Sequence, residues 1–253
     1  EDLPLVPSVR ALVTDPSWME YGHRVRIHGR VLRHVAPRVL LLENGGLVMP
    51  IETTSESEYL PGEAVEARGW PTRRRFTIAL QGAQLRRIDE TELQLGKPES
   101  ASGLPMMTSV ESIRSLPNEL AARAYPVDVR AVVTSVHQQR YVLFVQENSA
   151  GIYVDTADQV IEHLRPGQLV RLRGVTSAGG FAPVIAHPWI EVLGSGELPV
   201  PQRVDPKVAP SGAYDALWVE IEGRVRPMQV TDVGYLFNLI TSVGPVGAIM
   251  AHA

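Results

Sequence analysis

The sequence predicts an all-β protein built from small five-stranded barrels in tandem, and two observations lead to this fold class. One apolar–polar alternation occurs three times, at residues 25–31, 127–133 and 219–225, each with a small residue at the same place and a second apolar run after it. The 253 residues also include 21 Gly and 20 Pro, a content that favours turns and short strands over long helices. Each copy is spaced as one small domain.

The first two copies continue into aligned sets of five strands. In both, a Pro-Gly pair precedes the fourth strand, and the longest connection lies between the third and fourth strands. This order is that of the OB fold, in which the fifth strand closes the barrel and removes exposed edges. We expect a short helix over residues 157–164 in the second copy. The predicted strands are 24–33, 39–43, 47–52, 64–70 and 83–88 in copy one, and 127–137, 141–147, 151–155, 169–177 and 189–193 in copy two.

The third copy is shorter. It offers strands at 219–227, 235–240 and 246–250, and the sequence then stops before a Pro-Gly turn or two further strands. We therefore expect an incomplete third barrel, completed by further chain or by another component. Ser109 predicts a capped short helix over 109–116, and residues 118–123 predict a second one. The resulting division is an N-terminal connector 1–20, OB-like barrel 1 at 21–88, a connector with short helices at 89–124, OB-like barrel 2 at 125–197, a Pro-rich connector 198–216, and partial OB-like barrel 3 at 217–253.

Composition and motifs argue against catalysis. The chain has no Cys, which excludes disulfides, Cys-ligated zinc and a Cys nucleophile. The seven His are scattered, and no phosphate-binding loop, hydrolase serine motif or metalloprotease motif is present. We predict no catalytic residue, no metal site, no cofactor and no enzymatic activity. The net charge of -4 gives no general attraction to nucleic acid, and no apolar run has the length of a membrane helix.

Two loops hold the candidate binding residues. Residues 21–88 carry eleven Arg against six Glu, an excess of five positive charges. Arg73, Arg74 and Arg75 fall where the loop between strands four and five is expected, a frequent ligand loop of OB barrels. The same loop of copy two places Phe181 among glycines as an exposed anchor. The alternatives are a solvated hairpin tip for the arginines and a cap on the barrel core for Phe181.

A family resemblance appears in the second copy. The segments 130–134, 143–147, 151–155, 164–167, 174–176 and 180–185 occur in an order that resembles the extracytoplasmic sensor segment of large bacterial sensor histidine kinases and related membrane signalling proteins. The resemblance extends from about residue 110 to 225 and is weak in copy one. It implies an export signal before Glu1, and a completed barrel, a membrane helix and a cytoplasmic output domain after Ala253. It assigns no ligand-binding residue to this chain.

These observations predict a non-catalytic periplasmic sensing or interaction module of a two-component system. Any kinase activity would belong to a downstream domain absent from this chain. The expected partner is a small ligand or a protein, membrane contact would occur only through an absent segment, and nucleic acid is disfavoured. Signalling would proceed through a change in the angle between barrels. The alternative is an OB-fold protein that binds single-stranded nucleic acid through the basic barrel 1.

Overall fold

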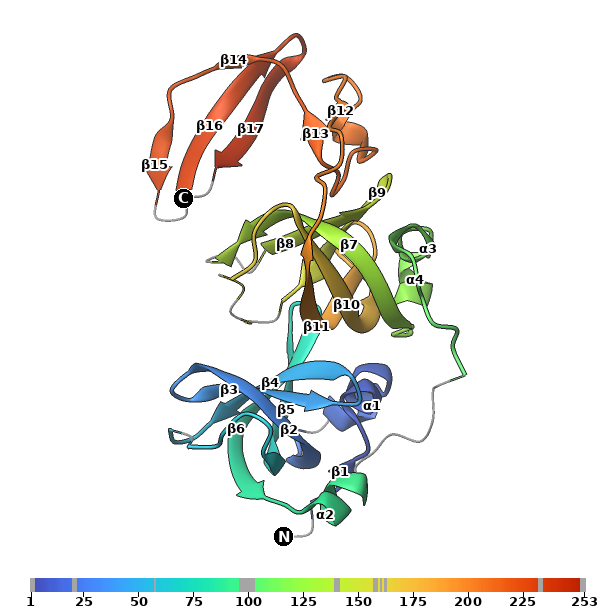
Figure 1. The fold of residues 1–253 in the computed structure, drawn as a ribbon, viewed down its shortest axis with the longest axis vertical. Helices are drawn as coiled ribbons and strands as arrows, with labels where there is room; N and C mark the ends of the chain where they lie inside the picture. Colours follow the sequence, from blue (N-terminus) through green and yellow to red (C-terminus); the bar gives the residue numbers. More distant parts are fainter. Residues whose placement is uncertain are drawn as a thin grey trace.

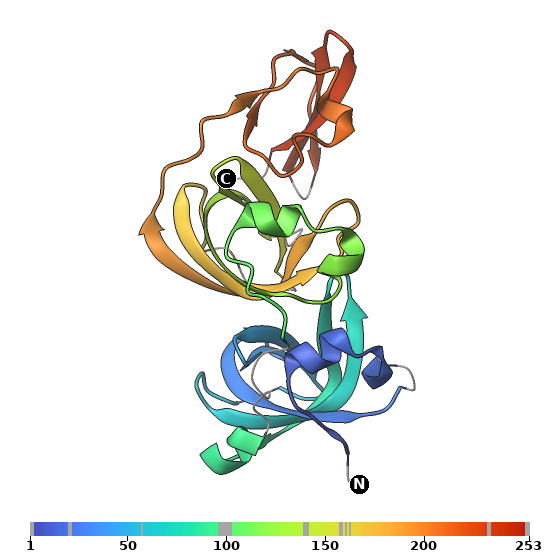
Figure 2. The same cartoon turned by 90° about the vertical axis from the view of Figure 1, so that its right-hand side faces the viewer.

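The computed structural model describes residues 3–19, 22–56, 58–95, 103–138, 142–156, 159, 161, 163–231 and 234–250. Two β-barrels and a smaller sheet follow one another along the long axis of the molecule (Figure 1). The N-terminus lies at the end of barrel 1, and the smaller sheet lies at the opposite end. The second view shows the same stacked order (Figure 2). The all-β fold class is therefore confirmed.

Barrel 1 is closed by two pairings between strands that are not consecutive in the sequence. Its first long strand pairs antiparallel with the fourth, and its third pairs parallel with the fifth, at Ile51 and Leu80. This is the OB-like topology expected from the order of the predicted strands. A short N-terminal strand, β1, adds to the first long strand in parallel. The strands are β1 (Leu5–Val6), β2 (Val25–Ala36), β3 (Val39–Asn44), β4 (Leu47–Thr53), β5 (Ala64–Arg74) and β6 (Thr77–Arg87).

Barrel 2 repeats this topology. Its first strand pairs antiparallel with its fourth, and its third meets its fifth in parallel at Val154 and Ile185. Residue 141 of the predicted second strand, and residues 157, 158, 160 and 162 of the predicted helix 157–164, lie outside the described residues. The strands are β7 (Pro126–His137), β8 (Val142–Glu147), β9 (Ala150–Asp155), β10 (Gln168–Ser177) and β11 (Val184–Ser195).

Both hairpins between the fourth and fifth strands are longer than predicted. In barrel 1, β5 extends to Arg74 and β6 begins at Thr77, so only Arg75 and Phe76 form the turn. The sequence interpretation placed a loop there, between the strands predicted at 64–70 and 83–88. The backbone nevertheless stays paired, with Arg73 opposite Ile78 and Arg74 opposite Thr77.

A short helix packs against each barrel with its first backbone N–H groups capped. Ser8 accepts from the Ala11 amide before α1 (Val9–Thr14), and Ser109 accepts from the Ser112 amide before α3 (Val110–Arg114). The helix predicted from Ser109 is thus confirmed, as is the second one, α4 (Asn118–Ala121). The other helices among the described residues are η1 (Pro16–Met19), α2 (Glu90–Leu95) and η3 (Ala209–Ser211).

The third unit is an open sheet rather than a barrel, as expected. Its predicted first strand, 219–227, is interrupted at residues 221–223, where the chain changes partners between two sheets. Several apolar side chains remain exposed, among them Val225 at 62% and Val230 at 72%. The strands are β12 (Gln202–Arg203), β13 (Val219–Glu220), β14 (Arg224–Val225), β15 (Gln229–Thr231), β16 (Gly234–Thr241) and β17 (Gly244–Met250).

Barrels 1 and 2 share a hydrophobic core at their junction. The buried cluster of barrel 1 includes Ala124 from the connector and Val175 and Ala186 from barrel 2. Removing this apolar surface from water favours a fixed contact between the two barrels. The junction therefore positions side chains of both barrels relative to one another.

Candidate functional site

The turn of the β5–β6 hairpin lies against barrel 2. The backbone N–H of Phe76 donates to Asp155 Oδ2 at 3.2 Å, and Thr77 Oγ1 donates to the same oxygen at 2.9 Å. Asp155 and Thr77 are buried, so these two hydrogen bonds satisfy groups that water does not reach. Arg75, with a φ of 49°, makes the tight reversal that brings the hairpin to this position. The hairpin that the sequence presented as a free ligand loop is thus part of the barrel junction.

Three aromatic side chains gather at this contact. Phe144 and Tyr153 lie directly opposite one another on β8 and β9, with ring centroids 5.6 Å apart. Phe76 approaches Tyr153 edge-on, with a centroid separation of 6.2 Å and an interplanar angle of 72°. All three rings are partly exposed. Strands two and three of an OB barrel form the face that binds oligonucleotides and oligosaccharides, and β8–β9 are those strands in barrel 2.

Tyr153 connects the aromatic group to the arginine run. Arg75 Nη1 donates to Tyr153 Oη at 3.1 Å. Burial raises the pKa of the Tyr153 phenol, the nearby Asp155 carboxylate raises it further, and the hydrogen bond from Arg75 opposes both effects. The phenol therefore stays protonated at neutral pH and holds the guanidinium beside the rings.

The predicted arginines have two different environments. Arg73 and Arg75 are exposed, whereas Arg74 is half-buried and forms an ion pair with Glu52 of β4. Arg73 and Arg75 therefore place positive charge at the solvent-exposed surface of this end of barrel 1. Their role as ligand-binding residues stays a prediction, now with Phe76, Phe144 and Tyr153 as neighbours.

Phe181 does not join this group. It lies in the β10–β11 loop with 67% of its surface exposed, and its ring packs against Gly212 of the following connector. A Cβ at Gly212 would lie 2.2 Å from the ring, so a side chain at residue 212 would have to displace the ring. The four predicted binding residues therefore belong to two separate places, and the anchor role of Phe181 stays a prediction.

A buried histidine completes the junction. His187 of β11 is fully buried, and its two ring nitrogens contact the backbone of barrel 1. Nε2 accepts from the Ile78 N–H at 3.2 Å, and Nδ1 lies 3.0 Å from the Val48 carbonyl oxygen, to which it donates. Burial lowers the pKa of His187 to about 4, which keeps the ring neutral and in this tautomer at physiological pH.

One further electrostatic interaction connects the two barrels. His163, which precedes β10, lies within the electrostatic influence of Arg33 on β2 and of Arg165. Burial lowers the pKa of His163, and the two guanidinium groups lower it further, so the neutral imidazole is favoured.

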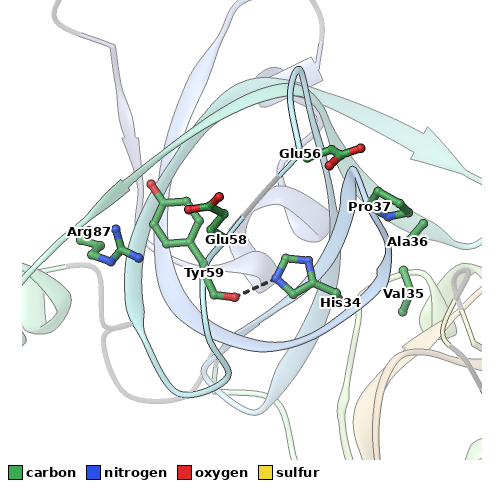
Figure 3. A pocket seen from close by; sticks show the side chains of 8 residues that line it. All are labelled: His34, Val35, Ala36, Pro37, Glu56, Glu58, Tyr59 and Arg87. Carbon is green, nitrogen blue, oxygen red and sulfur yellow. Dashed lines mark hydrogen bonds between the residues drawn. The ribbon is translucent and has the colours of Figure 1, made fainter.

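A hollow lies elsewhere on barrel 1. It has a volume of about 680 Å³ and is lined by the end of β2, the loop before β5 and Arg87 of β6. His34 Nε2 lies 2.8 Å from the Tyr59 carbonyl oxygen, and the Arg87 guanidinium stacks over the Tyr59 ring (Figure 3). Arg87 also pairs with Glu63, so the one guanidinium of this hollow is already engaged. Within the described part of the chain, no group of three or more His, Asp or Glu side chains is arranged to hold a metal ion.

Sequence reasoning missed Phe144, Asp155 and His187 as parts of the junction. The pairing of Phe144 with Tyr153 follows from the register of the β8–β9 hairpin and could have been predicted from the sequence. His187 and Asp155 carried no local signal, because their partners lie 109 and 78 or 79 residues away.

No family model and no curated protein matches the chain. Among solved structures, the Ifi202 HINa domain in complex with 20bp dsDNA is 10% identical with a TM-score of 0.32, and the match covers 69% of this chain and 100% of that chain. The p202 HIN1 domain in complex with 12-mer dsDNA is 11% identical with a TM-score of 0.33, covering 67% and 93%. The hypothetical protein ygiW from E. coli is 19% identical with a TM-score of 0.28, covering 37% and 100%.

The expectation that nucleic acid is disfavoured as a partner is wrong. Structures with bound double-stranded DNA, one of them a murine DNA binding protein, are among those that match the chain. Since the scores are low, what those proteins bind remains a property of those proteins. No described helix has the length and apolar character needed to cross a bilayer.

Proposed function

We propose that this chain is a non-catalytic module that binds single-stranded nucleic acid at the junction of barrels 1 and 2. The observation that supports this function is the contact of Arg75 with Tyr153, whose ring pairs with that of Phe144, while Arg73 lies exposed two residues before Arg75. Proteins that bind single strands without sequence preference combine stacking aromatics with cationic side chains that follow the backbone. The β8–β9 face supplies the rings, and the β5–β6 hairpin supplies the charges.

The aromatic rings and the arginines would contact different parts of a bound single strand. Unstacked bases would lie on the partly exposed rings of Phe144 and Tyr153, which is possible for a single strand but not for bases held in a duplex. Arg75 is already oriented by Tyr153, so contact with a phosphate requires little loss of side-chain freedom. Arg73, one strand residue away from the paired Arg74, supplies a second positive charge.

The test is a fluorescence anisotropy titration of the full chain with labelled oligothymidylate over a range of salt concentrations. Phe144→Ala removes one stacking ring and is expected to weaken binding by about tenfold or more. Arg73→Gln is expected to weaken binding and to reduce the salt dependence by about 0.7 in log–log slope.

A matched control is Arg87→Gln, which removes the same charge from the hollow beside Tyr59. It is expected to leave the affinity within about twofold of the unmodified chain, because its guanidinium is engaged by Glu63. Equal losses for Arg73→Gln and Arg87→Gln, or an affinity that Phe144→Ala does not change, would overturn the proposal.

The sensing role implied by the family resemblance, its periplasmic location and the absence of catalysis stay predictions. The junction of barrels 1 and 2 does not favour the signalling mechanism expected for a sensing module. The shared core and the hydrogen bonds of Asp155 and His187 oppose a change in the angle between barrels 1 and 2. A ligand-dependent movement would have to occur at the connector that leads to the third sheet.

A further inference from the structure

A row of arginines covers the outer face of barrel 1, away from the junction residues discussed above. Arg26 of β2 lies opposite Arg68 of β5, and Glu66 of β5 lies opposite Arg86 of β6. Residues opposite one another in antiparallel strands project from the same face of the sheet. Arg30 of β2 and Arg24, which directly precedes β2, extend the row. We call these five arginines, Arg24, Arg26, Arg30, Arg68 and Arg86, the arginine face.

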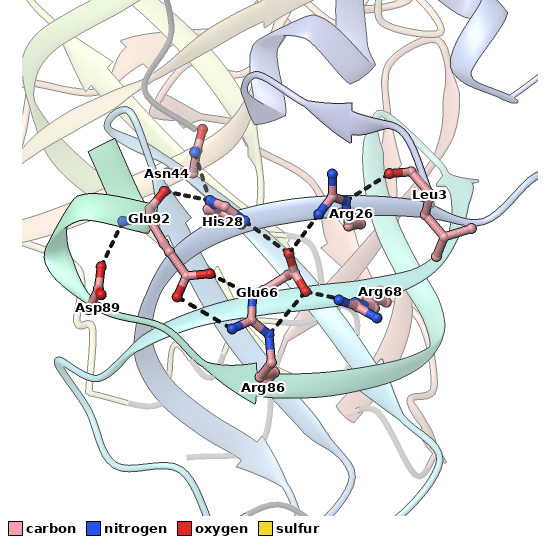
Figure 4. A network of polar contacts seen from close by, with 9 residues as sticks. All are labelled: Leu3, Arg26, His28, Asn44, Glu66, Arg68, Arg86, Asp89 and Glu92. Carbon is pink, nitrogen blue, oxygen red and sulfur yellow. Dashed lines mark hydrogen bonds and ion pairs between the residues drawn. The ribbon is translucent and has the colours of Figure 1, made fainter. Parts of the chain in front are cut away.

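A single buried carboxylate organises the centre of this face. Glu66, 1% exposed, contacts Arg26 at 3.4 Å, Arg68 at 2.7 Å and Arg86 at 3.4 Å (Figure 4). Burial alone raises the pKa of Glu66, but the hydrogen bonds from Arg68, His28 and Arg86 outweigh it and lower the pKa to about 2. Glu66 is therefore charged, yet one carboxylate offsets one guanidinium of the five.

The short acidic helix α2 covers part of the arginine face. Glu90 forms a two-oxygen contact with Arg30, at 2.7 and 2.6 Å. Glu92 contacts Arg86 at 2.9 and 3.3 Å, and its carbonyl oxygen lies 2.8 Å from His28 Nδ1. Paired oxygens facing guanidinium groups are also the arrangement that phosphate presents.

The charges of this face do not balance without α2. Five arginines against Glu66 leave an excess of four positive charges, and Glu90 and Glu92 reduce the excess to two. Arg68 and Arg86 keep 38% and 48% of their side-chain surface exposed even with α2 in place. A structural role in holding Glu66 accounts for its nearest neighbours, but not for Arg24 or Arg30, which the described contacts do not connect to Glu66.

The contacts that hold α2 suit a removable segment. The helix has six residues, too few to be stable in water by itself. Its contacts with the barrel include exposed ion pairs, with Glu90 66% and Glu92 38% exposed, and its Leu93 is only partly buried. Exposed ion pairs contribute little and weaken with salt, so a polyanion can compete for the same arginines.

We infer that the arginine face is a second surface for nucleic acid, which binds the phosphate backbone, and that α2 occupies it as an acidic strap in the free protein. This inference extends the proposed function but does not depend on base stacking at Phe144 and Tyr153. Arg24 and Arg26 are two residues apart and Arg26 and Arg30 four apart, which places these cations about 7 and about 13 Å from one another along a line and suits a chain of phosphates. Binding at this face would be independent of sequence.

The experiment uses a short random-sequence DNA duplex without single-stranded ends, which offers backbone but no unstacked bases. The double variant E90Q/E92Q keeps the size of both side chains and removes the negative charges of the strap. It is expected to bind the duplex about fivefold more tightly near 50 mM salt, with a log–log salt slope steeper by about 2. The control E56Q/E58Q makes the same charge change in the exposed loop before β5 and is expected to leave both quantities close to those of the unmodified chain.

A third variant adds Arg30→Gln to E90Q/E92Q. Arg30 does not contact Glu66, so its loss leaves the buried network intact, and it is expected to reverse most of the gain in affinity. Melting curves and circular dichroism of each variant check that the fold is retained. Equal duplex binding by E90Q/E92Q and E56Q/E58Q would overturn this inference. That outcome would not affect the proposed function, which is tested by Phe144→Ala on single strands.

Discussion

His187 of barrel 2 accepts a hydrogen bond from the backbone N–H of Ile78 in barrel 1 at 3.2 Å, and its other ring nitrogen lies 3.0 Å from the carbonyl oxygen of Val48. One imidazole therefore bridges β4 and β6 near their starts, where no β4–β6 register pair joins Val48 to Ile78. The ring forms hydrogen bonds with a backbone N–H and a backbone carbonyl, as a neighbouring strand does elsewhere in the sheet. The barrel junction is consequently part of the hydrogen bonding of barrel 1.

Replacing His187 should weaken the folded state. His187→Asn tolerates the left-handed backbone at this position, where φ is 52°, but its side chain is too short to reach both backbone groups. The Ile78 N–H and the Val48 carbonyl would remain buried without these bonds, so the free energy of unfolding is expected to fall by about 3 kcal/mol. Urea denaturation at neutral pH measures it. A loss below about 0.5 kcal/mol would contradict the bridging role.

The same histidine should make stability depend on pH. Its folded pKa is about 4, and the unfolded chain has a histidine pKa of about 6.5. The unfolded state therefore binds more protons between these values, so this contribution is complete above about pH 6.5 and is lost as the pH falls to about 4. The expected total loss is about 3 kcal/mol. Denaturation curves at several pH values should show this slope in the unmodified chain and a smaller one in His187→Asn.

The strands were largely predictable because their determinants are local. Alternation, Pro-Gly turns and small residues at the bends identified both five-stranded sets, and the capping serine Ser109 identified α3. The main errors lie at the β5–β6 and β10–β11 hairpins, where strand residues next to charged or glycine-rich sequence were predicted to be loop. For Arg73 and Arg74 the pairing partner, rather than the residue type, decides the conformation.

The candidate site was less predictable than the fold. The sequence identified the arginine run, but it could not place the run in contact with Tyr153. Arg75 and Tyr153 are 78 residues apart and belong to different barrels. Their proximity depends on how two complete barrels pack, which no repeat or motif within either copy encodes. The covering of the arginine face by α2 was also hidden, because Glu90 and Arg30 are 60 residues apart in the sequence.

Glu66 gives a second, separable pH dependence. Its folded pKa is about 2, below the value of about 4.3 of an unfolded glutamate. The unfolded state binds more protons in this window, so the contribution is present above about pH 4.3 and is lost as the pH falls towards about 2. Glu66→Gln should remove this acid dependence and cost about 2 kcal/mol at neutral pH, a value reduced because the arginine partners remain partly solvated. Unchanged acid unfolding in Glu66→Gln would refute the assignment.

Gly29 should be intolerant of any side chain. A Cβ at this position of β2 would lie 2.6 Å from the Glu43 carbonyl oxygen and 2.7 Å from Leu42 Cγ, so β2 and β3 would have to separate where the barrel bends. Gly29→Ala is therefore expected to lower the free energy of unfolding by about 1–3 kcal/mol despite the smaller entropy of the unfolded chain. Gly180→Ala is the matched control, because a Cβ there meets no atom within 4 Å, and its melting temperature should stay close to that of the unmodified chain. If the two alanine variants melt together, the close approach of β2 and β3 at Gly29 does not limit the bend of barrel 1.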